Sequence, residues 1–154
     1  MNKLLRILKH RWFDQSDTRR ALGPAVVQRL QQRVAASERR HSGEIRVCVE
    51  AGLPLSYLWR GLGARDRAVT MFGKLRVWDT EFNNGVLIYL LLAEHAIEIV
   101  ADRGLNAQVS SAQWSQIVAT MREAFRAGRH EQGLGAAIDA VDALLRQHFA
   151  LAPG

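Results

Sequence analysis

Hydrophobic positions recur along the chain with two different periods, which predict a mixture of helices and strands. The spacing of three and four residues that is typical of amphipathic helices occurs over residues 2–12, 23–43, 61–75, 110–128 and 132–148. The alternating or continuous apolar runs that are typical of strands occur over residues 44–50, 85–92 and 97–102. Helical and strand segments therefore follow one another within a single chain of 154 residues.

The order of these segments predicts how the sheet is connected. A helix separates the strand over 44–50 from the strand over 85–92, which is the arrangement of a parallel crossover. The run over 85–92 is apolar on both faces, so we expect a central strand that is covered on two sides. A short turn leads into 97–102 and predicts an antiparallel hairpin. The expected fold class is α/β: a three-layer α/β/α sandwich with a small mixed sheet and helices on both faces.

Charge divides the chain into a basic N-terminal segment, residues 1–22, and a single domain, residues 23–150. Of the net charge of +6, the excess lies in residues 1–40, which hold ten Lys and Arg against three Asp and Glu. Because the excess is local, we expect no nucleic-acid partner. The single Cys48 excludes a disulfide framework.

The helix predicted over residues 2–12 has a hydrophobic face, and two interpretations of it stay open. Basic residues flank that face, which consists of Leu4, Leu5, Leu8 and Trp12. Such a helix suits an anionic membrane surface, and it equally suits docking on its own domain or on a second copy in a homo-oligomer. Because so short a helix is marginal alone, the sequence favours docking, with Trp12 and Phe13 as the anchor.

Targeting signals are not evident in the sequence. The longest apolar run is far shorter than the roughly 18–20 residues of a membrane-spanning helix. The basic start has no continuous apolar stretch followed by small residues, so it does not have the pattern of a secretory signal. We expect a cytoplasmic protein, and peripheral membrane association stays open.

The predicted topology brings three polar segments, residues 38–44, 78–85 and 101–104, to one end of the sheet. Carboxylate and amide oxygens are the ligands that hard cations prefer, so we expect Ca²⁺ or Mg²⁺ there. The candidate metal ligands are Asp79, Asp102 and Glu44. The candidate ligand-binding residues are Arg103, Asn83, Asn84 and His41.

Ordinary turns are a strong alternative explanation for each of these residues. Asn83, Asn84 and Gly85 form a good turn before a strand, and a solvated pair in Asp102 and Arg103 contributes almost nothing to stability. The "GLG" at 61–63 lacks the third glycine of a dinucleotide fingerprint, because Asp66 stands there. No motif for nucleophilic catalysis is present, so we assign no catalytic residue and expect no nucleotide, haem or flavin.

Three stretches, "GEIRVCVE", "WDTEFNNGVLIYL" and "IVADRG", make the chain resemble the TPM domain family over residues 25–149. The resemblance implies a compact α/β/α sandwich, an acid-phosphatase activity and, in some members, divalent-cation binding near loops at one sheet end. Many relatives carry a secretory signal and a transmembrane segment. This chain shows neither pattern, so it resembles a cytosolic bacterial-type member.

Three functions remain open at this point. The first is a TPM-like module that binds a divalent cation, a protein partner or both at one sheet end, where a membrane-associated partner is one option. The alternative is a metal-dependent acid-type phosphatase, in which carboxylates hold the ion and Arg103 stabilises the phosphoryl charge. The second alternative is a structural or accessory subunit that binds no ligand.

Overall fold

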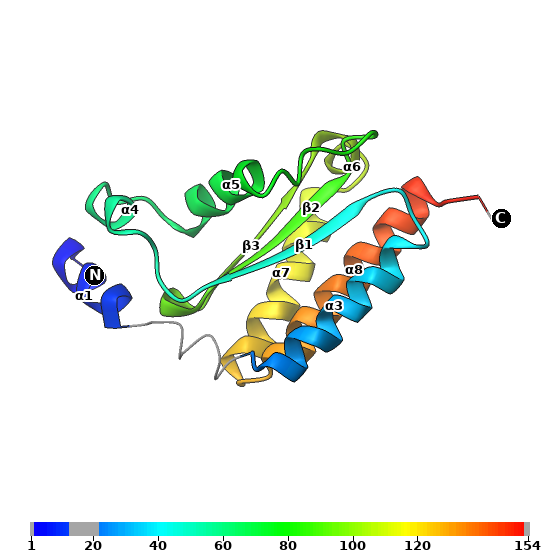
Figure 1. The fold of residues 1–154 in the computed structure, drawn as a ribbon. Helices are drawn as coiled ribbons and strands as arrows, with labels where there is room; N and C mark the ends of the chain where they lie inside the picture. The colour runs from blue at the N-terminus through cyan, green and yellow to red at the C-terminus, as the bar shows by residue number, and fades with distance from the viewer. Residues whose placement is uncertain (1, 13–21, 153–154) are drawn as a thin grey trace.

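A three-stranded mixed sheet runs through the middle of the computed structural model, which describes residues 2–12 and 22–152 (Figure 1). Its strands are β1 (Glu44–Glu50), β2 (Gly85–Leu91) and β3 (Ala96–Ala101). β1 pairs with β2 in parallel, and β2 pairs with β3 in antiparallel. The predicted pairing and the central position of β2 are confirmed.

Helices cover both faces of the sheet (Figure 1). One face carries three long helices, α3 (Pro24–Glu38), α7 (Ser111–Arg126) and α8 (His130–Phe149). The other face carries α5 (Ala64–Lys74), with the short α4 (Leu55–Trp59) beside it. A 3-10 turn, η1 (Leu92–Glu94), joins β2 to β3, and α6 (Arg103–Asn106) follows β3. The predicted α/β sandwich is confirmed.

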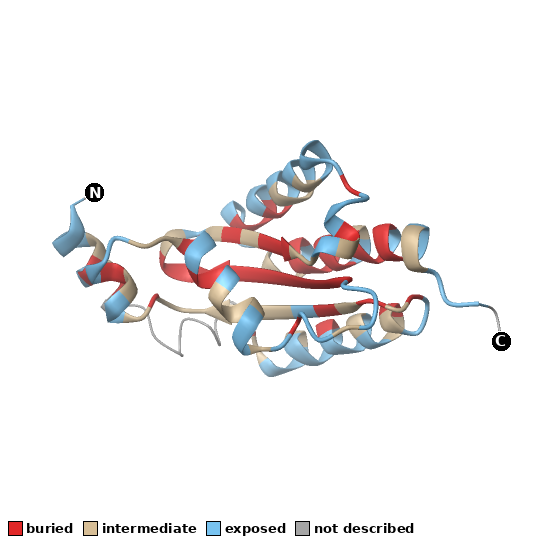
Figure 2. Ribbon diagram, turned by 90° about the horizontal axis from the view of Figure 1, so that it is seen from above, coloured by how far each residue is buried: buried red, intermediate tan, exposed pale blue. Residues whose placement is uncertain are grey.

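Strand periodicity divides the apolar side chains between two cores. Val86, Ile88 and Leu90 of β2 point to the core under α3, α7 and α8. Leu87 and Tyr89 point to the core under α5. β2 is therefore buried along its whole length, as Figure 2 shows. This double burial explains why its sequence is continuously apolar rather than alternating.

The predicted boundary of α3 is wrong. The helix ends at Glu38, whereas the pattern predicted an end near Gly43. The chain turns at Arg40 and then runs beside the end of α8, where Ser42 N donates to Phe149 O at 3.0 Å. Gly43 serves close packing there, because a Cβ would lie 2.9 Å from Asn84 O. Spacing places Val27 on the apolar face of this helix, but the residue is exposed in the structure.

α1 (Lys3–Trp12) folds back on the domain, as the sequence favoured, and packs against α4 and η1. Ile7 enters the core beneath α5, and His10 is buried. The side chain of Trp12 and residue Phe13, the predicted anchor, lie outside the described residues. Over the described residues, no helix is long and apolar enough to span a bilayer.

Candidate functional site

The predicted convergence of polar segments at one sheet end is confirmed for the backbone. β1 and β2 begin there, with Glu44 opposite Gly85, and β3 ends there, with Ala101 opposite Val86. Beyond the last pair, Asp102 N donates to Gly85 O at 2.9 Å. We call the loops at this end, residues 76–84 and 102–104, the sheet-end loops.

Hydrogen bonds within the sheet-end loops fix their conformation. Gly104 N donates to Asn83 O at 2.7 Å, and this ties the two loops together. Thr80 Oγ1 accepts from Asn84 N at 3.0 Å. Asn83 has a φ of 52°, the left-handed conformation that asparagine tolerates better than most residues. The predicted turn before β2 is thus present.

Two aromatic side chains stand out from these loops. Trp78 and Phe82 are 47% and 50% exposed. The indole N–H of Trp78 donates to Gly73 O at 3.1 Å, and the guanidinium of Arg76 lies 5.4 Å from its ring centroid. The ring of Phe82 lies 6.4 Å from that of Phe149. The aromatic rings are therefore held in place while much of their surface faces solvent.

Each candidate metal ligand has a contact of its own within the fold. Asp79 pairs with Arg76 at 3.0 Å, and both side chains are exposed. Asp102 caps the first turn of α6, where its Oδ1 accepts from Arg103 N at 2.7 Å. Glu44 lies 3.5 Å from a guanidinium nitrogen of Arg46.

These carboxylates do not form a preformed metal centre. In the part of the chain that the structure describes, no three His, Cys, Asp or Glu side chains come close enough together to hold a metal ion. Each contact above uses one oxygen of its carboxylate, and Arg76 and Arg46 place a positive charge beside Asp79 and Glu44, which opposes a cation there. Metal binding by Asp79, Asp102 and Glu44 therefore stays a prediction.

Asn84 is the candidate residue with an unused polar atom. The residue is fully buried, and its side-chain amide donates to Ser42 Oγ at 3.0 Å. Its Oδ1 is the buried side-chain atom that, among the described residues, has no hydrogen-bond partner. A buried carbonyl oxygen of this kind can accept a hydrogen bond from water or coordinate a hard cation. Arg103, by contrast, is exposed at the start of α6.

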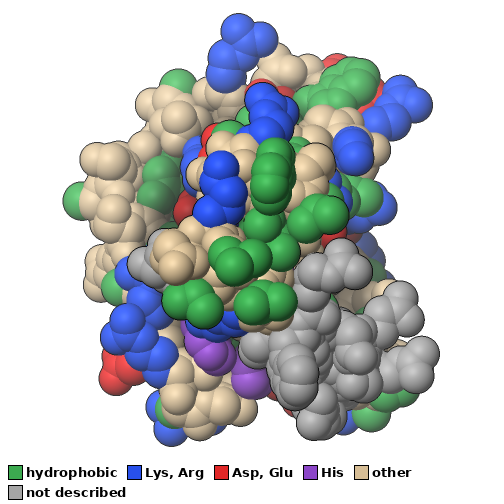
Figure 3. All heavy atoms as spheres, turned by 90° about the vertical axis from the view of Figure 1, so that its left-hand side faces the viewer, with side chains coloured by type: hydrophobic (Ala, Val, Ile, Leu, Met, Phe, Trp, Pro, Cys, Tyr) green, Lys and Arg blue, Asp and Glu red, His purple; other side chains and the backbone are tan. Residues whose placement is uncertain are grey.

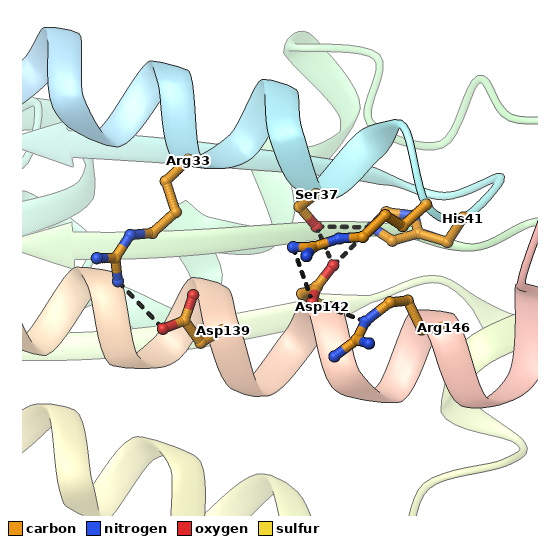
Figure 4. Close-up of polar contacts among 7 residues, drawn as sticks. Arg33, Ser37, His41, Asp139, Asp142 and Arg146 are labelled. Carbon is orange, nitrogen blue, oxygen red and sulfur yellow. Dashed lines mark hydrogen bonds and ion pairs between the residues drawn. The ribbon is translucent and has the colours of Figure 1, made fainter.

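His41 does not lie among the sheet-end loops. Its ring is buried between α3 and α8, as Figure 4 shows. Nδ1 accepts from Gly43 N at 3.1 Å, so Nε2 carries the proton and donates to Ser37 Oγ at 2.8 Å. Ser37 in turn donates to Asp142 Oδ1 at 2.6 Å.

This chain of hydrogen bonds runs in the wrong direction for nucleophilic catalysis. A catalytic histidine accepts the proton of the serine, whereas Nε2 of His41 is a donor to Ser37. Ser37 is also buried and donates its own proton to Asp142. The group joins α3 to α8, and we assign it no chemical role.

Two arginines complete the group around Asp142 (Figure 4). Arg146 Nε and Arg40 Nη2 lie 2.9 and 3.2 Å from Asp142 Oδ2. Burial alone would raise the pKa of Asp142, but the hydrogen bond from Ser37 and the charges of both arginines lower it overall. Sequence reasoning missed Ser37 and Asp142; the four-residue spacing of Ser37 and His41 was the available signal.

Comparisons with known proteins agree with this fold. Among curated proteins, none matches the chain. The solved structure of the BA42 protein from the psychrophilic bacterium Bizionia argentinensis is 27% identical, covers 85% of this chain and 86% of that chain, and has a TM-score of 0.75. The N-terminal domain of a protein from P. gingivalis is 20% identical, covers 86% and 83% of the two chains, has a TM-score of 0.66, and is similar in fold.

The family comparison covers most of the chain. A model of the TPM domain matches residues 15–144, which include the whole sheet and both sheet-end loops. The resemblance noted from three short stretches of sequence is therefore confirmed over residues 15–144. The chain belongs to the TPM domain family.

Proposed function

We propose that the chain is a non-catalytic binding module whose sheet-end loops recognise a protein partner. The observation that carries this proposal is the pair Trp78 and Phe82, which are half exposed on loops held by hydrogen bonds. Trp and Arg contribute much of the binding energy in protein interfaces, and Arg76 and Arg103 lie on the same loops. Loops that are already ordered lose little entropy on binding.

A divalent cation, Ca²⁺ or Mg²⁺, is the second ligand that we propose for this end of the sheet. The unpartnered Oδ1 of Asn84 favours it, because amide oxygens are suitable ligands for hard cations. Against it, the carboxylates of Asp79, Asp102 and Glu44 are already engaged. Since these residues do not fit a preformed centre, we assign no chemical step to a metal.

The metal-dependent acid-type phosphatase is the alternative activity, and a ligand-free structural subunit is the second alternative. A phosphatase would need the carboxylates to exchange their present contacts for an ion, with Arg103 free to bind a phosphoryl group. Ser37 cannot act as its nucleophile in this fold, because its proton is donated to Asp142. We therefore rank the binding module first.

Affinity capture from the source cells tests the protein partner. We expect wild-type protein to retain at least one partner whose yield falls roughly tenfold when Trp78→Ala and Phe82→Ala are combined, as expected for interface hot spots. The control is Trp59→Ala, because Trp59 is even more exposed but lies on α4, away from these loops. Equal yields from all three proteins would contradict a partner at these loops.

A thermal-shift series with Ca²⁺, Mg²⁺ and Mn²⁺ after chelation tests the cation. Binding to the folded state should raise the melting temperature progressively with metal concentration. The double variant Asp79→Asn/Asp102→Asn should lose this rise, while Asp139→Asn, an exposed site on α8, should retain it. No rise at millimolar metal rules out the cation. Phosphate release from an aryl phosphate that disappears in the double variant would instead establish the phosphatase.

A further inference from the structure

α1 is attached to the domain by the side opposite to its leucines. His10 Nδ1 accepts from Leu53 N at 2.9 Å, and its Nε2 lies 2.9 Å from Glu94 Oε1. Arg6 pairs with the same carboxylate, and Ile7 is buried. These contacts hold α1 in one orientation beside α4 (Figure 1).

The three leucines of the hydrophobic face of α1 therefore stay in solvent. Leu4, Leu5 and Leu8 are more than half exposed, and Leu55 and Trp59 of α4 are 50% and 67% exposed. Lys3 Nζ lies 5.6 Å from the ring centroid of Trp59, which connects the two helices. We call these five apolar residues the α1–α4 patch, and Figure 3 shows apolar side chains gathered at this end of the molecule, with Lys and Arg side chains beside them.

The segments that carry the α1–α4 patch contain basic residues and no acidic ones. α1 contains four Lys and Arg and no Asp or Glu. Residues 53–65, which include α4, contain Arg60 and Arg65 and again no acidic residue. An exposed apolar patch of this kind marks an interaction site, and its charge selects the partner.

A second copy of the chain is a poor partner for this surface. A two-fold contact would place the same patch on both copies, so the cations around one patch would face those around the other. An anionic bilayer offers the opposite: negative headgroups for the cations, and acyl chains for the leucines. Tryptophan also suits the boundary between headgroups and acyl chains.

We propose that the α1–α4 patch binds the surface of a bilayer that contains anionic lipids. The attachment of α1 through Ile7 and His10 makes this favourable, since the helix is already folded and its leucines already face outward. A short helix that had to fold on the membrane would lose that ordering entropy at binding. The sequence alone favoured docking on the domain over membrane contact; in the structure α1 docks and still presents its apolar face.

Cosedimentation of the full chain with vesicles tests this proposal. We expect binding to mixed phosphatidylcholine and phosphatidylglycerol vesicles, several-fold weaker binding to phosphatidylcholine alone, and a decrease with added salt. Leu4→Ser combined with Leu8→Ser should weaken partition by on the order of tenfold or more, because two leucine side chains are then no longer buried among the acyl chains. Leu151→Ser, which removes an exposed leucine beyond the end of α8, is the matched control and should bind normally.

Charge variants separate the patch from the overall positive charge of the protein. Neutralising Lys3, Lys9 and Arg60 with glutamine should weaken partition roughly fivefold for each cation near the surface. The control neutralises Arg122, Arg126 and Arg129, which removes equal charge at the end of α7. This control should retain most of the binding.

Three results would overturn the proposal. The first is a folded wild-type protein that fails to bind anionic vesicles. The second is binding that both charge variants weaken equally and that the leucine variant does not change, since net charge alone would then explain it. The third is a dimer, detected by light scattering without vesicles, that the leucine variant dissociates. Circular dichroism establishes that each variant is folded.

Discussion

His41 and Asp142 are ionisable groups in the interior, and both depend on their hydrogen bonds for a stable charge state. Burial lowers the pKa of His41, and its Nδ1 accepts a backbone hydrogen bond that only an unprotonated nitrogen can accept. The ring is therefore neutral in the folded protein. Asp142 is the reverse case, because its lowered pKa keeps it charged.

Stability should decrease as the pH falls below about 6.5, the ordinary pKa of histidine. The unfolded chain then binds a proton at His41 that the folded chain does not, so the stability present above this pH is progressively lost. Asp142 adds a further loss of stability only below its ordinary pKa, near 4.

Urea unfolding between pH 7.5 and 5 measures the effect of His41. His41→Gln should weaken the dependence of stability on pH. The part that remains should come from His130, whose pKa burial also lowers. An unchanged slope in the variant would contradict this assignment.

Gly104 should be intolerant of any side chain. A Cβ there would overlap the carbonyl oxygens of Phe82 and Asn83, and these are backbone atoms that cannot move aside cheaply. We expect Gly104→Ala to cost roughly 1–3 kcal/mol. Gly73→Ala is the matched control, because nothing lies within 4 Å of a Cβ in the last turn of α5, and it should stabilise by about 0.5–1 kcal/mol. Urea unfolding of both variants gives the comparison, and equal effects would contradict it.

At the scale of elements, α3 and α8 are joined by the buried hydrogen bond of Ser37 to Asp142 and by the exposed ion pair of Arg33 with Asp139 (Figure 4). The side chain of Asp142 is 5% exposed and that of Asp139 is 65% exposed. Arg33 Nη1 lies 3.1 Å from Asp139 Oδ2, so the exposed pair has good geometry as well. The two aspartates therefore differ both in burial and in their partners, since Asp142 also accepts from Ser37.

Asp142→Ala should cost about 1–3 kcal/mol, because it leaves Ser37 buried without its acceptor, while Arg40 and Arg146 are half exposed and stay solvated. Asp139→Ala should cost less than about 1 kcal/mol, since water screens an exposed pair. Chemical unfolding at neutral pH measures both. Similar costs at the two sites would show that burial does not set the energy of this contact.

Removal of residues 1–12 should destabilise the domain, although α1 lies outside the layers of the sandwich. The truncation exposes the core beside Ile7 and leaves the Leu53 N–H and the Glu94 carboxylate without partners. Loss of partners alone corresponds to about 1–3 kcal/mol for each group that stays buried. A thermal melt of the truncated chain checks this, and an unchanged melting temperature would mean that α1 contributes no stability.

At the scale of the whole molecule, β2 connects the two cores. Its side chains alternate between the core under α3, α7 and α8 and the core under α5, and every residue of the strand is buried. Neither core is complete without this strand. The two faces should therefore lose their structure together.

We expect a single cooperative unfolding transition. Far-ultraviolet circular dichroism reports mainly on the helices, and fluorescence reports on tryptophans, which lie on both faces of the sheet, such as Trp59 and Trp114. The two probes should give the same midpoint in urea, as a two-state transition requires. Midpoints that differ would show that one face unfolds independently.

Much of the fold was determined by local pattern in the sequence. The bounds of β1, the antiparallel pairing of β2 and β3, and the central position of β2 were predicted, because periodicity and double burial can be recognised from neighbouring residues. The end of α3 and the short α4 and α6 were not predicted. Their bounds depend on contacts with distant segments, such as that of Ser42 with Phe149.

The candidate site was likewise predicted only in part. Topology was sufficient to bring the three polar segments to one end of the sheet. Which atoms remain available there was decided by tertiary contacts: Arg76 holds Asp79, Arg103 N holds Asp102, and His41 turns towards Ser37.

The orientation of α1 was likewise decided in three dimensions. The sequence determined that the helix is amphipathic, since that follows from spacing alone. It did not determine which side meets the domain, because Ile7 and His10 dock only where Leu53 and Glu94, more than forty residues away, provide a partner surface. Side-chain pairing across such sequence distances depends on how the layers pack, and the packing leaves Leu4, Leu5 and Leu8 facing solvent.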